Sequence, residues 1–312
     1  PLGVGMLGMH GNYGPNVLTN ECDVLIAVGM RFDDRVTGRL DKYAKQAKVI
    51  HLDIDPSEID KNVKADVPVW GDCKETLPML TRLVEQKVYP QWLQQFRNYQ
   101  QQEEEKVIKD ELNPSGDILT MGEVVRNLNE LTGGNAVIVT DVGQHQMVAC
   151  RYAKYNQSKS NITSGGLGTM GYALPAAIGA AYGAPDRTVV AIIGDGGFQM
   201  TLQELGTIMQ FKPDVKILIL NNNFLGMVRQ WQQLFHEKRY SFVDIQSPDF
   251  VQVAKGFGIP GKSIAKREDL HAALKELLES KGSYLLEVMV GKENNVFPMV
   301  PQGRGVAEIV LS

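Results

Sequence analysis

The chain has 312 residues, of which 43% are hydrophobic and 22% are charged, and its formal net charge is −4. This length accommodates two domains, and the composition is that of an ordinary globular protein. The slightly acidic balance argues against a nucleic-acid-binding face, which requires clustered basic residues. No apolar run approaches the roughly 20 residues of a membrane-spanning helix.

The three cysteines and the first residues bear on where the protein resides. Cys22, Cys73 and Cys150 stand far apart without CxxC spacing, which indicates neither a zinc site nor a disulfide framework. Reduced cysteines are typical of the cytoplasm, and we expect that location. The segment from Pro1 to Gly14 lacks initiator Met and signal-peptide features, so we expect a fragment of a longer protein.

The first part of the chain alternates strand and helix signals. Short apolar runs predict strands at 23–29, 48–54 and 67–70, and a helix is predicted at about 74–86. The sequence from Asp55 to Glu58 is a favourable helix start after the second strand. Residues 89–117 are rich in Gln, Glu and Lys and end in Asn-Pro-Ser-Gly, so we expect a solvated linker with some helix there.

The second part repeats this alternation more strongly. Strands are predicted at 136–140, 188–193, 215–220 and 284–290, and an amphipathic helix at 269–280. The tail from Lys292 to Ser312 has little regular pattern, and we expect a mobile lid or a frayed end. Strands alternating with helices predict an α/β fold with a doubly wound parallel sheet, which binds ligands at the carboxyl ends of its strands.

Polar side chains follow two of these strands. Asp195 ends one strand within the sequence Gly-Asp-Gly-Gly, and Asn222 ends the next within Asn-Asn-Asn. The stretch between them is long enough for a helix and a return to a neighbouring parallel strand. Carboxylate, amide and carbonyl oxygens suit the octahedral coordination of Mg²⁺, and glycines allow backbone amides to approach a phosphate. The pair therefore predicts a site for magnesium and phosphate.

Each of these features alone has an ordinary structural explanation. Asp-Gly is a common turn, and a loop histidine such as His145 is more often a hydrogen-bonded structural residue than a catalytic one. The glycine-rich segment 164–171 leads into an Ala-rich helix whose small residues favour close packing. The coincidence of Gly-Asp-Gly with Asn-Asn about 25 residues later, both at strand ends, favours the functional interpretation.

Several longer segments carry a family resemblance over essentially the whole chain. VGQHQM (142–147), TSGGLGTMGYALPAAIGA (163–180), GDGGFQMTLQEL (194–205), LILNNNFLGMVRQWQ (218–232) and FPMVPQGRG (297–305) resemble the acetohydroxyacid synthase catalytic subunits, which use thiamine diphosphate. GMHGNYGPN (8–16), IAVGMRFDDRVTG (26–38) and DIDPSEIDK (53–61) resemble the central FAD-binding domain of that family. Members of the family often have serine at the position of Gly197, so this chain would lack one hydroxyl contact to phosphate.

The resemblance implies a domain order and a cofactor site. Residues 1–88 would be the carboxyl-terminal part of the central FAD-type domain, 89–117 a linker, and 118–312 the thiamine diphosphate domain with its tail. The metal ligands would be Asp195, Asn222 and the carbonyl of Phe224. The cofactor would lie against Gln144, His145, Gly168, Met170, Gly194, Asp195, Gly196, Gly197, Asn222, Leu225, Gly226 and Met227.

The same resemblance implies a substrate pocket and a second cofactor. Met227 and Trp231 would line the pocket for the second 2-keto acid, although Trp231 by itself would be taken for a core aromatic one helical turn after Met227. FAD, which is largely structural in this family, would contact His10, Gly11, Asn12, Gly29, Arg31, Asp53 and Asp55. Asp33 and Asp34 by themselves indicate only a surface charge cluster.

The implied activity is carboligation of pyruvate with a second 2-keto acid, giving acetolactate or acetohydroxybutyrate. The proton-relay glutamate of the family lies on a separate amino-terminal domain, so no catalytic acid or base is assigned in this chain. The resemblance also implies a homodimer or larger assembly and a regulatory small subunit. The alternatives are another thiamine-diphosphate carboligase or decarboxylase, or a cofactor-binding fragment without turnover. A nucleotide-binding Rossmann protein is disfavoured, because no GxGxxG follows a strand.

Overall fold

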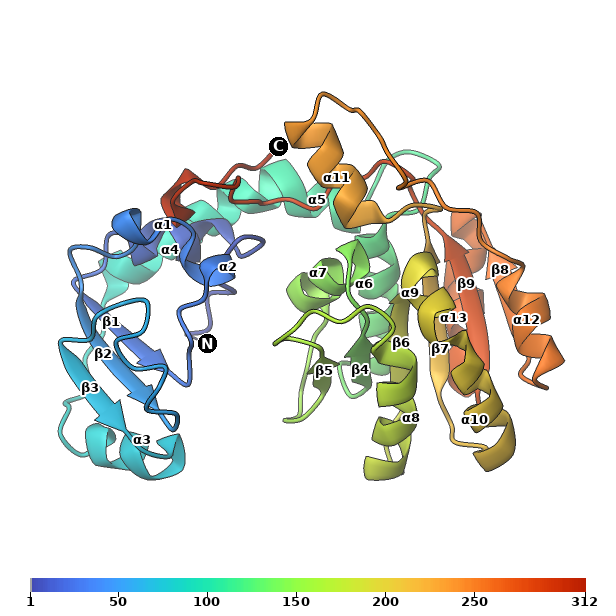
Figure 1. Ribbon diagram of the computed structural model, residues 1–312, viewed down its shortest axis with the longest axis horizontal. Coiled ribbons are helices and arrows are strands. Elements are labelled where there is room, and N and C mark those ends of the chain that lie inside the picture. The colour runs from blue at the N-terminus through green and yellow to red at the C-terminus, as the bar shows by residue number, and fades with distance from the viewer. Residues whose placement is uncertain (1) are drawn as a thin grey trace. The chain divides into compact units, whose positions relative to one another are not determined.

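The computed structural model describes residues Leu2–Ser312, which form two compact units. The first unit contains the residues up to Ile108 together with Phe297–Ser312, and the second contains Lys109–Val296. Figure 1 shows a sheet in each unit, both with parallel strands. No helix in the described part of the chain has the length and apolar character needed to cross a membrane.

The second unit is built on a six-stranded parallel sheet of order β5-β4-β6-β7-β9-β8. Its strands are β4 (Val137–Thr140), β5 (Asn161–Thr163), β6 (Val189–Gly194), β7 (Lys216–Asn221), β8 (Gly261–Ile264) and β9 (Tyr284–Met289). The chain moves from β4 to one side for β5 and then to the other side for β6. The sheet therefore has a topological switch point between β4 and β6, where doubly wound folds bind ligands.

Helices cover both faces of this sheet, and alternate strand residues pack against each layer (Figure 1). On β6, Val190 and Ile192 belong to one core cluster, whereas Val189, Ala191 and Ile193 belong to the other. The first cluster includes side chains of α6 (Met121–Thr132), α7 (Gln144–Tyr152) and α13 (Arg267–Glu279). The second includes side chains of α8 (Ala173–Gly183), α9 (Asp195–Thr201), α10 (Leu205–Phe211) and α12 (Phe250–Gly256). The predicted α/β fold with a doubly wound parallel sheet is confirmed.

The first unit contains a three-stranded parallel sheet of order β1-β2-β3. Its elements are α1 (Tyr13–Thr19), β1 (Val24–Val28), α2 (Asp34–Thr37), β2 (Lys48–Asp53), β3 (Val67–Trp70), α3 (Cys73–Thr81) and α4 (Pro90–Glu103). The buried Glu103 at the end of α4 accepts hydrogen bonds from Tyr13 N (2.7 Å) and Asn12 Nδ2 (3.0 Å). About half of the expected linker is thus the helix α4, which belongs to the first unit, and a π-helical turn (Glu104–Ile108) and α5 (Lys109–Leu112) follow it.

The tail differs from our expectation of a mobile lid or a frayed end. Met299, Val300 and Val306 are each at most 3% exposed. Val300 N donates to Met9 O at 2.7 Å, and Met299 forms an antiparallel bridge with Val310. Residues 297–312 therefore belong to the first unit and not to the second, where we had expected them. The tail has no regular sequence pattern, but the burial of its apolar side chains holds it in place.

Of two expected helices, the one after Asp55 does not form and the one at 74–86 is shorter than the sequence suggested. The segment after Asp55 forms turns, because Asp60 takes a left-handed backbone conformation (φ 63°) and its side chain accepts a hydrogen bond from Ala65 N. The helix expected at 74–86 ends at Thr81. The edge strands β5 and β8 were not predicted, since they are short and carry polar residues.

Truncating a core side chain of β9 tests the packing of the second unit. Leu286 is 0% exposed between β7 and β8, so Leu286→Ala should lower the free energy of unfolding by about 2–5 kcal/mol. Leu167, which is 94% exposed, is the matched control, and its replacement by Ala should change stability by less than about 0.5 kcal/mol. Urea denaturation measures both, and equal effects would contradict the assigned core.

Candidate functional site

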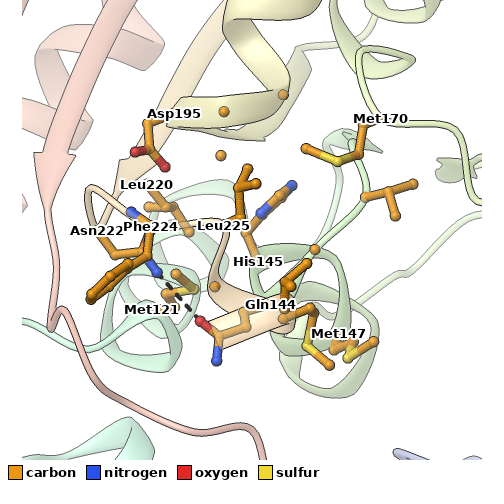
Figure 2. Close-up of a pocket in the computed structure, with 18 of the residues that line it drawn as sticks. Met121, Gln144, His145, Met147, Met170, Asp195, Leu220, Asn222, Phe224 and Leu225 are labelled. Atoms are coloured by element: carbon orange, nitrogen blue, oxygen red, sulfur yellow. Dashed lines mark hydrogen bonds between the residues drawn. The ribbon is translucent and has the colours of Figure 1, made fainter. Parts of the chain in front are cut away.

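A pocket of about 280 Å³ opens at the carboxyl ends of β4, β6 and β7, next to the switch point of the large sheet (Figure 2). The twelve residues predicted to hold the cofactor all line it, as does Phe224. The complete lining is Met121, Val142, Gly143, Gln144, His145, Met147, Gly168, Met170, Gly194, Asp195, Gly196, Gly197, Leu220, Asn222, Phe224, Leu225, Gly226, Met227 and Val228. Segments that are far apart in sequence thus meet because parallel strands end at one edge.

Asp195 begins α9 directly after β6 and is 2% exposed. Burial raises the pKa of this carboxyl to about 6, against hydrogen bonds from backbone amides and from the Ser247 hydroxyl. Ser247 Oγ lies 3.4 Å from Asp195 Oδ2. A buried carboxylate that lacks a cationic partner is a strong ligand for a metal ion, which would restore its charged form.

The loop after β7 presents an amide and a carbonyl beside this carboxylate. Asn222 is 4% exposed, and its Oδ1 accepts a hydrogen bond from Phe224 N at 3.1 Å. Leu225 N donates to Val243 O, and Ile245 N donates to Asn223 O. These two bonds flank Phe224 without using its carbonyl. A carboxylate, an amide oxygen and a backbone carbonyl match the hard-oxygen preference of Mg²⁺.

The amino terminus of α11 (Gly226–Phe235) faces the same pocket. Leu225, Gly226 and Met227 line it, and no side chain caps the first turn of the helix. The N–H groups and the helix dipole at this end favour an anion. A Cβ atom at Gly226 would lie only 2.2 Å from Gln144 Oε1, so a larger residue here would require the buried Gln144 amide to move.

His145 lines the pocket from α7, and it is 5% exposed. Its ring packs against Gly143 and Gly194, where an added Cβ would approach Cε1 to 2.9 and 2.8 Å. Burial lowers the pKa of the imidazole to about 4, so the ring is neutral near pH 7. Among the described residues, Nε2 has no hydrogen-bond partner. This buried polar atom fits a ligand group that would complete its hydrogen bonding.

Gly197 lies against a second buried carboxyl. Asp141, at 0% exposure, accepts a hydrogen bond from Ala173 N at 3.2 Å, and burial raises its pKa. A Cβ on Gly197 would lie 1.8 Å from Asp141 Oδ2. Glycine therefore accommodates the present position of Asp141, and a larger residue here would require that carboxyl to rotate.

The residues that line the pocket, all within the described chain, include no lysine and no arginine. The described residues also contain no cluster of three or more His, Cys, Asp or Glu that could bind a metal by themselves. A diphosphate in this pocket would therefore need a divalent cation to balance its charge. The donor set at Asp195, Asn222 and Phe224 fits that cation with one charged protein ligand.

Trp231 is not among the residues that line this pocket. It is half-buried on α11, and its ring centroid lies 4.9 Å from that of Phe235. Met227, one helical turn earlier, does line the pocket. The expectation that Trp231 contacts a second substrate stays a prediction.

The residues expected to contact FAD fall into two groups within the first unit. Gly29 and Arg31 follow β1, and Gly29 N donates to Leu52 O at 2.8 Å. Asp53 is the last residue of the neighbouring strand β2, and Asp55 follows it. His10, Gly11 and Asn12 precede α1. Asp53 is 7% exposed and accepts a hydrogen bond from Asp55 N, and burial of this kind suits a ligand-binding carboxylate. Asp33 caps α2 by accepting a hydrogen bond from Arg35 N, which gives it a structural role.

Met121, Leu220 and Val228 also line the pocket, although the sequence did not single them out. Leu220 lies in β7 and Val228 in α11, both within a segment that we had identified by resemblance. Met121 begins α6, and no local sequence signal distinguishes it from other apolar core residues. Only the packing of α6 against the sheet brings it to the pocket.

Two family profiles match the chain. Residues 141–288 match the profile described as "Thiamine pyrophosphate enzyme, C-terminal TPP binding domain", and residues 1–80 match "Thiamine pyrophosphate enzyme, central domain". The twelve residues predicted to hold the cofactor all lie within the first match.

Three curated relatives are similar over almost the whole chain. The chain is 43% identical over 311 residues to the acetolactate synthase isozyme 2 large subunit of Escherichia coli (strain K12), covering 99% of the chain and 55% of that protein. It is 42% identical over 319 residues to acetolactate synthase 1, chloroplastic, of Nicotiana tabacum, covering 99% and 48%. It is 43% identical over 319 residues to the acetolactate synthase large subunit of Parasynechococcus marenigrum (strain WH8102), covering 99% and 50%. The chain spans about half the length of the curated relatives it matches.

Asp195 and His145, the two pocket residues whose pKa values are given above, should change the pH dependence of stability in opposite directions. The pKa of Asp195 is raised from 3.8 to about 6. The stability that this group adds to the folded state is therefore present below pH 3.8 and is lost as the pH rises through about 6. The pKa of His145 is lowered from 6.5 to about 4. The stability that the neutral ring adds to the folded state is therefore present above pH 6.5 and is lost as the pH falls through about 4. In the metal-free chain the two contributions oppose each other between these limits.

Single variants should separate them. Relative to the unsubstituted chain, Asp195→Asn should become more stable as the pH rises from 4 to 6, by at most about 1.4 kcal/mol per pH unit. His145→Gln should show the reverse trend over the same range. Chemical denaturation at several pH values, with a chelator present, measures both differences. Parallel stability curves for all three proteins would contradict the shifted pKa values.

Proposed function

Because the chain belongs to the thiamine pyrophosphate enzymes, as a homologue of acetolactate synthase large subunits, we propose that its pocket holds the diphosphate and Mg²⁺ of that cofactor. The protein completed to the length of its relatives would join pyruvate to a second 2-keto acid, giving acetolactate or acetohydroxybutyrate. The observation that carries this proposal is the buried Asp195, placed beside Asn222 in a pocket whose lining residues include no lysine or arginine.

Each part of the pocket has a role in this proposal. Asp195, Asn222 and the Phe224 carbonyl would bind Mg²⁺, and the amides at the start of α11 would donate to the diphosphate. The neutral His145 would offer Nε2 to the cofactor without adding charge, while Gly168 and Met170 would contact its aminopyrimidine. When bound, thiamine diphosphate supplies the nucleophilic carbon and the electron sink for decarboxylation, and the protein supplies orientation and electrostatics.

We further propose that the first unit binds FAD through the two groups of residues around β1, β2 and α1. The support is the position of Gly29 and Asp53 at the ends of neighbouring parallel strands, where a nucleotide can reach the backbone and a carboxylate. We also propose a homodimer or larger assembly, a regulatory small subunit, and a cytoplasmic location. The three cysteines are unpaired in the structure, as is typical of a reducing compartment.

Removal of the single charged ligand tests the metal site. Asp195→Ala should abolish measurable binding of Mg²⁺ with thiamine diphosphate. Without its charged protein ligand the Mg²⁺ ion would not stay bound, and the charge of the diphosphate would not be compensated. Asp186→Ala, which removes an exposed carboxylate from a turn before β6, is the control and should bind as the unsubstituted chain does. Isothermal titration calorimetry measures both. Unchanged binding in Asp195→Ala would sink the proposed metal site.

Replacement of Trp231 tests the second-substrate pocket. In the protein completed to the length of its relatives, Trp231→Leu should lower the preference for 2-ketobutyrate over pyruvate, with an effect of about 1–3 kcal/mol at most. Thiamine diphosphate affinity should stay nearly unchanged, since Trp231 does not line the cofactor pocket. The assay offers both keto acids together and measures the ratio of the two products.

Phe235→Leu serves as the comparison, because it removes the ring that packs against Trp231. A ratio that changes equally in both variants would attribute the effect to loss of this aromatic contact. An unchanged ratio in Trp231→Leu would return Trp231 to a purely structural role.

A further inference from the structure

A chain of three side-chain amides runs from the proposed metal site to the segment that follows β9. Asn222 Nδ2 donates to Gln144 Oε1 at 3.3 Å, and Figure 2 shows this bond. Gln144 Nε2 donates in turn to Gln230 Oε1 at 2.9 Å and to Asn294 O at 2.8 Å. All three amides are buried, at 4%, 3% and 0% exposure, so water does not compete for these bonds.

Backbone groups at the far end fix the direction of the whole chain. Gln230 Nε2 donates to Val296 O at 3.0 Å, and Gln230 Oε1 accepts from Val296 N at 2.9 Å. A backbone N–H only donates and a carbonyl only accepts, so this pair allows a single orientation of the Gln230 amide. Gln230 Oε1 and the Asn294 carbonyl both accept hydrogen bonds from Gln144 Nε2, so they fix the orientation of the Gln144 amide. Gln144 Oε1 finally faces Asn222 Nδ2.

The orientation of Asn222 decides whether it can bind a cation. An amide oxygen can bind Mg²⁺, whereas an amide NH₂ group carries partial positive charge and has no lone pair to offer. Since Nδ2 is held by Gln144, Oδ1 is the atom left to serve the site. The bond from Phe224 N to Oδ1 favours the same orientation.

We propose that Gln230 is a positioning residue for the metal site and acts through Gln144 to hold Asn222 with its oxygen toward Mg²⁺. Gln144 would then act mainly on Asn222, because both hydrogens of its amide are already donated to Gln230 and Asn294. This inference rests on the proposed function, which places Mg²⁺ at Asn222. It assigns a role to a residue that does not line the pocket.

The test compares Gln230→Met with Gln232→Met in the full chain. Methionine has a similar length and shape but neither donates nor accepts as an amide does. Gln232 lies on the same helix and makes an analogous pair of bonds, with Ser241 O at 3.1 Å and Ser241 N at 2.9 Å, away from the amide chain. Calorimetric titration of Mg²⁺ in the presence of thiamine diphosphate should show about 10–100-fold weaker binding for Gln230→Met and no change for Gln232→Met.

A second pair of variants separates positioning from general structural damage. In Asn222→Asp, the carboxylate presents an oxygen whichever way it faces, so the orientation set by Gln144 no longer matters. Gln144 Oε1 then faces a carboxylate oxygen instead of an NH₂ group, and Gln230→Met frees Gln144 to turn, so adding it to Asn222→Asp should not weaken Mg²⁺ binding further. If Gln230→Met caused an equal loss with and without the Asn222→Asp substitution, the proposal would be overturned, because that result would indicate a distorted pocket.

The remaining outcomes also decide the matter. Unchanged Mg²⁺ affinity in Gln230→Met overturns the inference alone, whereas an unsubstituted chain that binds neither Mg²⁺ nor thiamine diphosphate overturns the proposed function as well. If circular dichroism shows that Gln230→Met does not fold, Gln230→Glu replaces it. Full burial favours the protonated carboxyl, which can accept from Gln144 Nε2 and Val296 N and donate to Val296 O, so Mg²⁺ affinity should be retained, and its loss would count against the proposal.

Discussion

The carboxylate of Asp195 is buried at the end of β6, and no lysine or arginine lines the pocket around it. Burial without a cationic partner raises the pKa of this carboxyl to about 6, so its charged form is unfavourable unless a cation binds beside it. The surrounding groups are consistent with this constraint. A neutral histidine, an amide, a carbonyl and the amide end of α11 provide polar atoms but no compensating cation.

The pocket depends on the parallel sheet for its position and on side-chain amides for its detail. Parallel pairing of β4, β6 and β7 brings Gln144, Asp195 and Asn222 to one edge. That arrangement places the right residues together, but it does not determine which atom of an amide faces the cavity. The hydrogen bonds from Asn222 to Gln144 and onward to the backbone of Val296 make that choice. Buried polar networks of this kind specify orientation because every alternative leaves a donor or an acceptor unpaired.

The two units differ in how their sequence patterns relate to their cores. In the second unit, continuous apolar strands are covered on both faces by helices, which is the usual pattern for buried parallel strands. In the first unit, β1 has an alternating pattern with Val24, Ile26 and Val28 at 42–50% exposure. Its small core is completed by Val306 from the carboxyl-terminal tail.

The sequence by itself determined the alternating α/β order and the four central strands of the large sheet, and it predicted Asp195 and Asn222 at strand ends, which the structure places in one pocket. Each of these features has a local signal: an apolar run, a glycine turn, or a polar residue at a strand end. Only the tertiary structure decided the features that depend on distant partners. The tail packs in the first unit, β5 and β8 pair at the sheet edges, and Gln230 meets Gln144 across 86 positions of the chain. Hydrogen bonds and burial between such distant residues leave no periodic pattern in the sequence, because their partners become neighbours only when the chain folds.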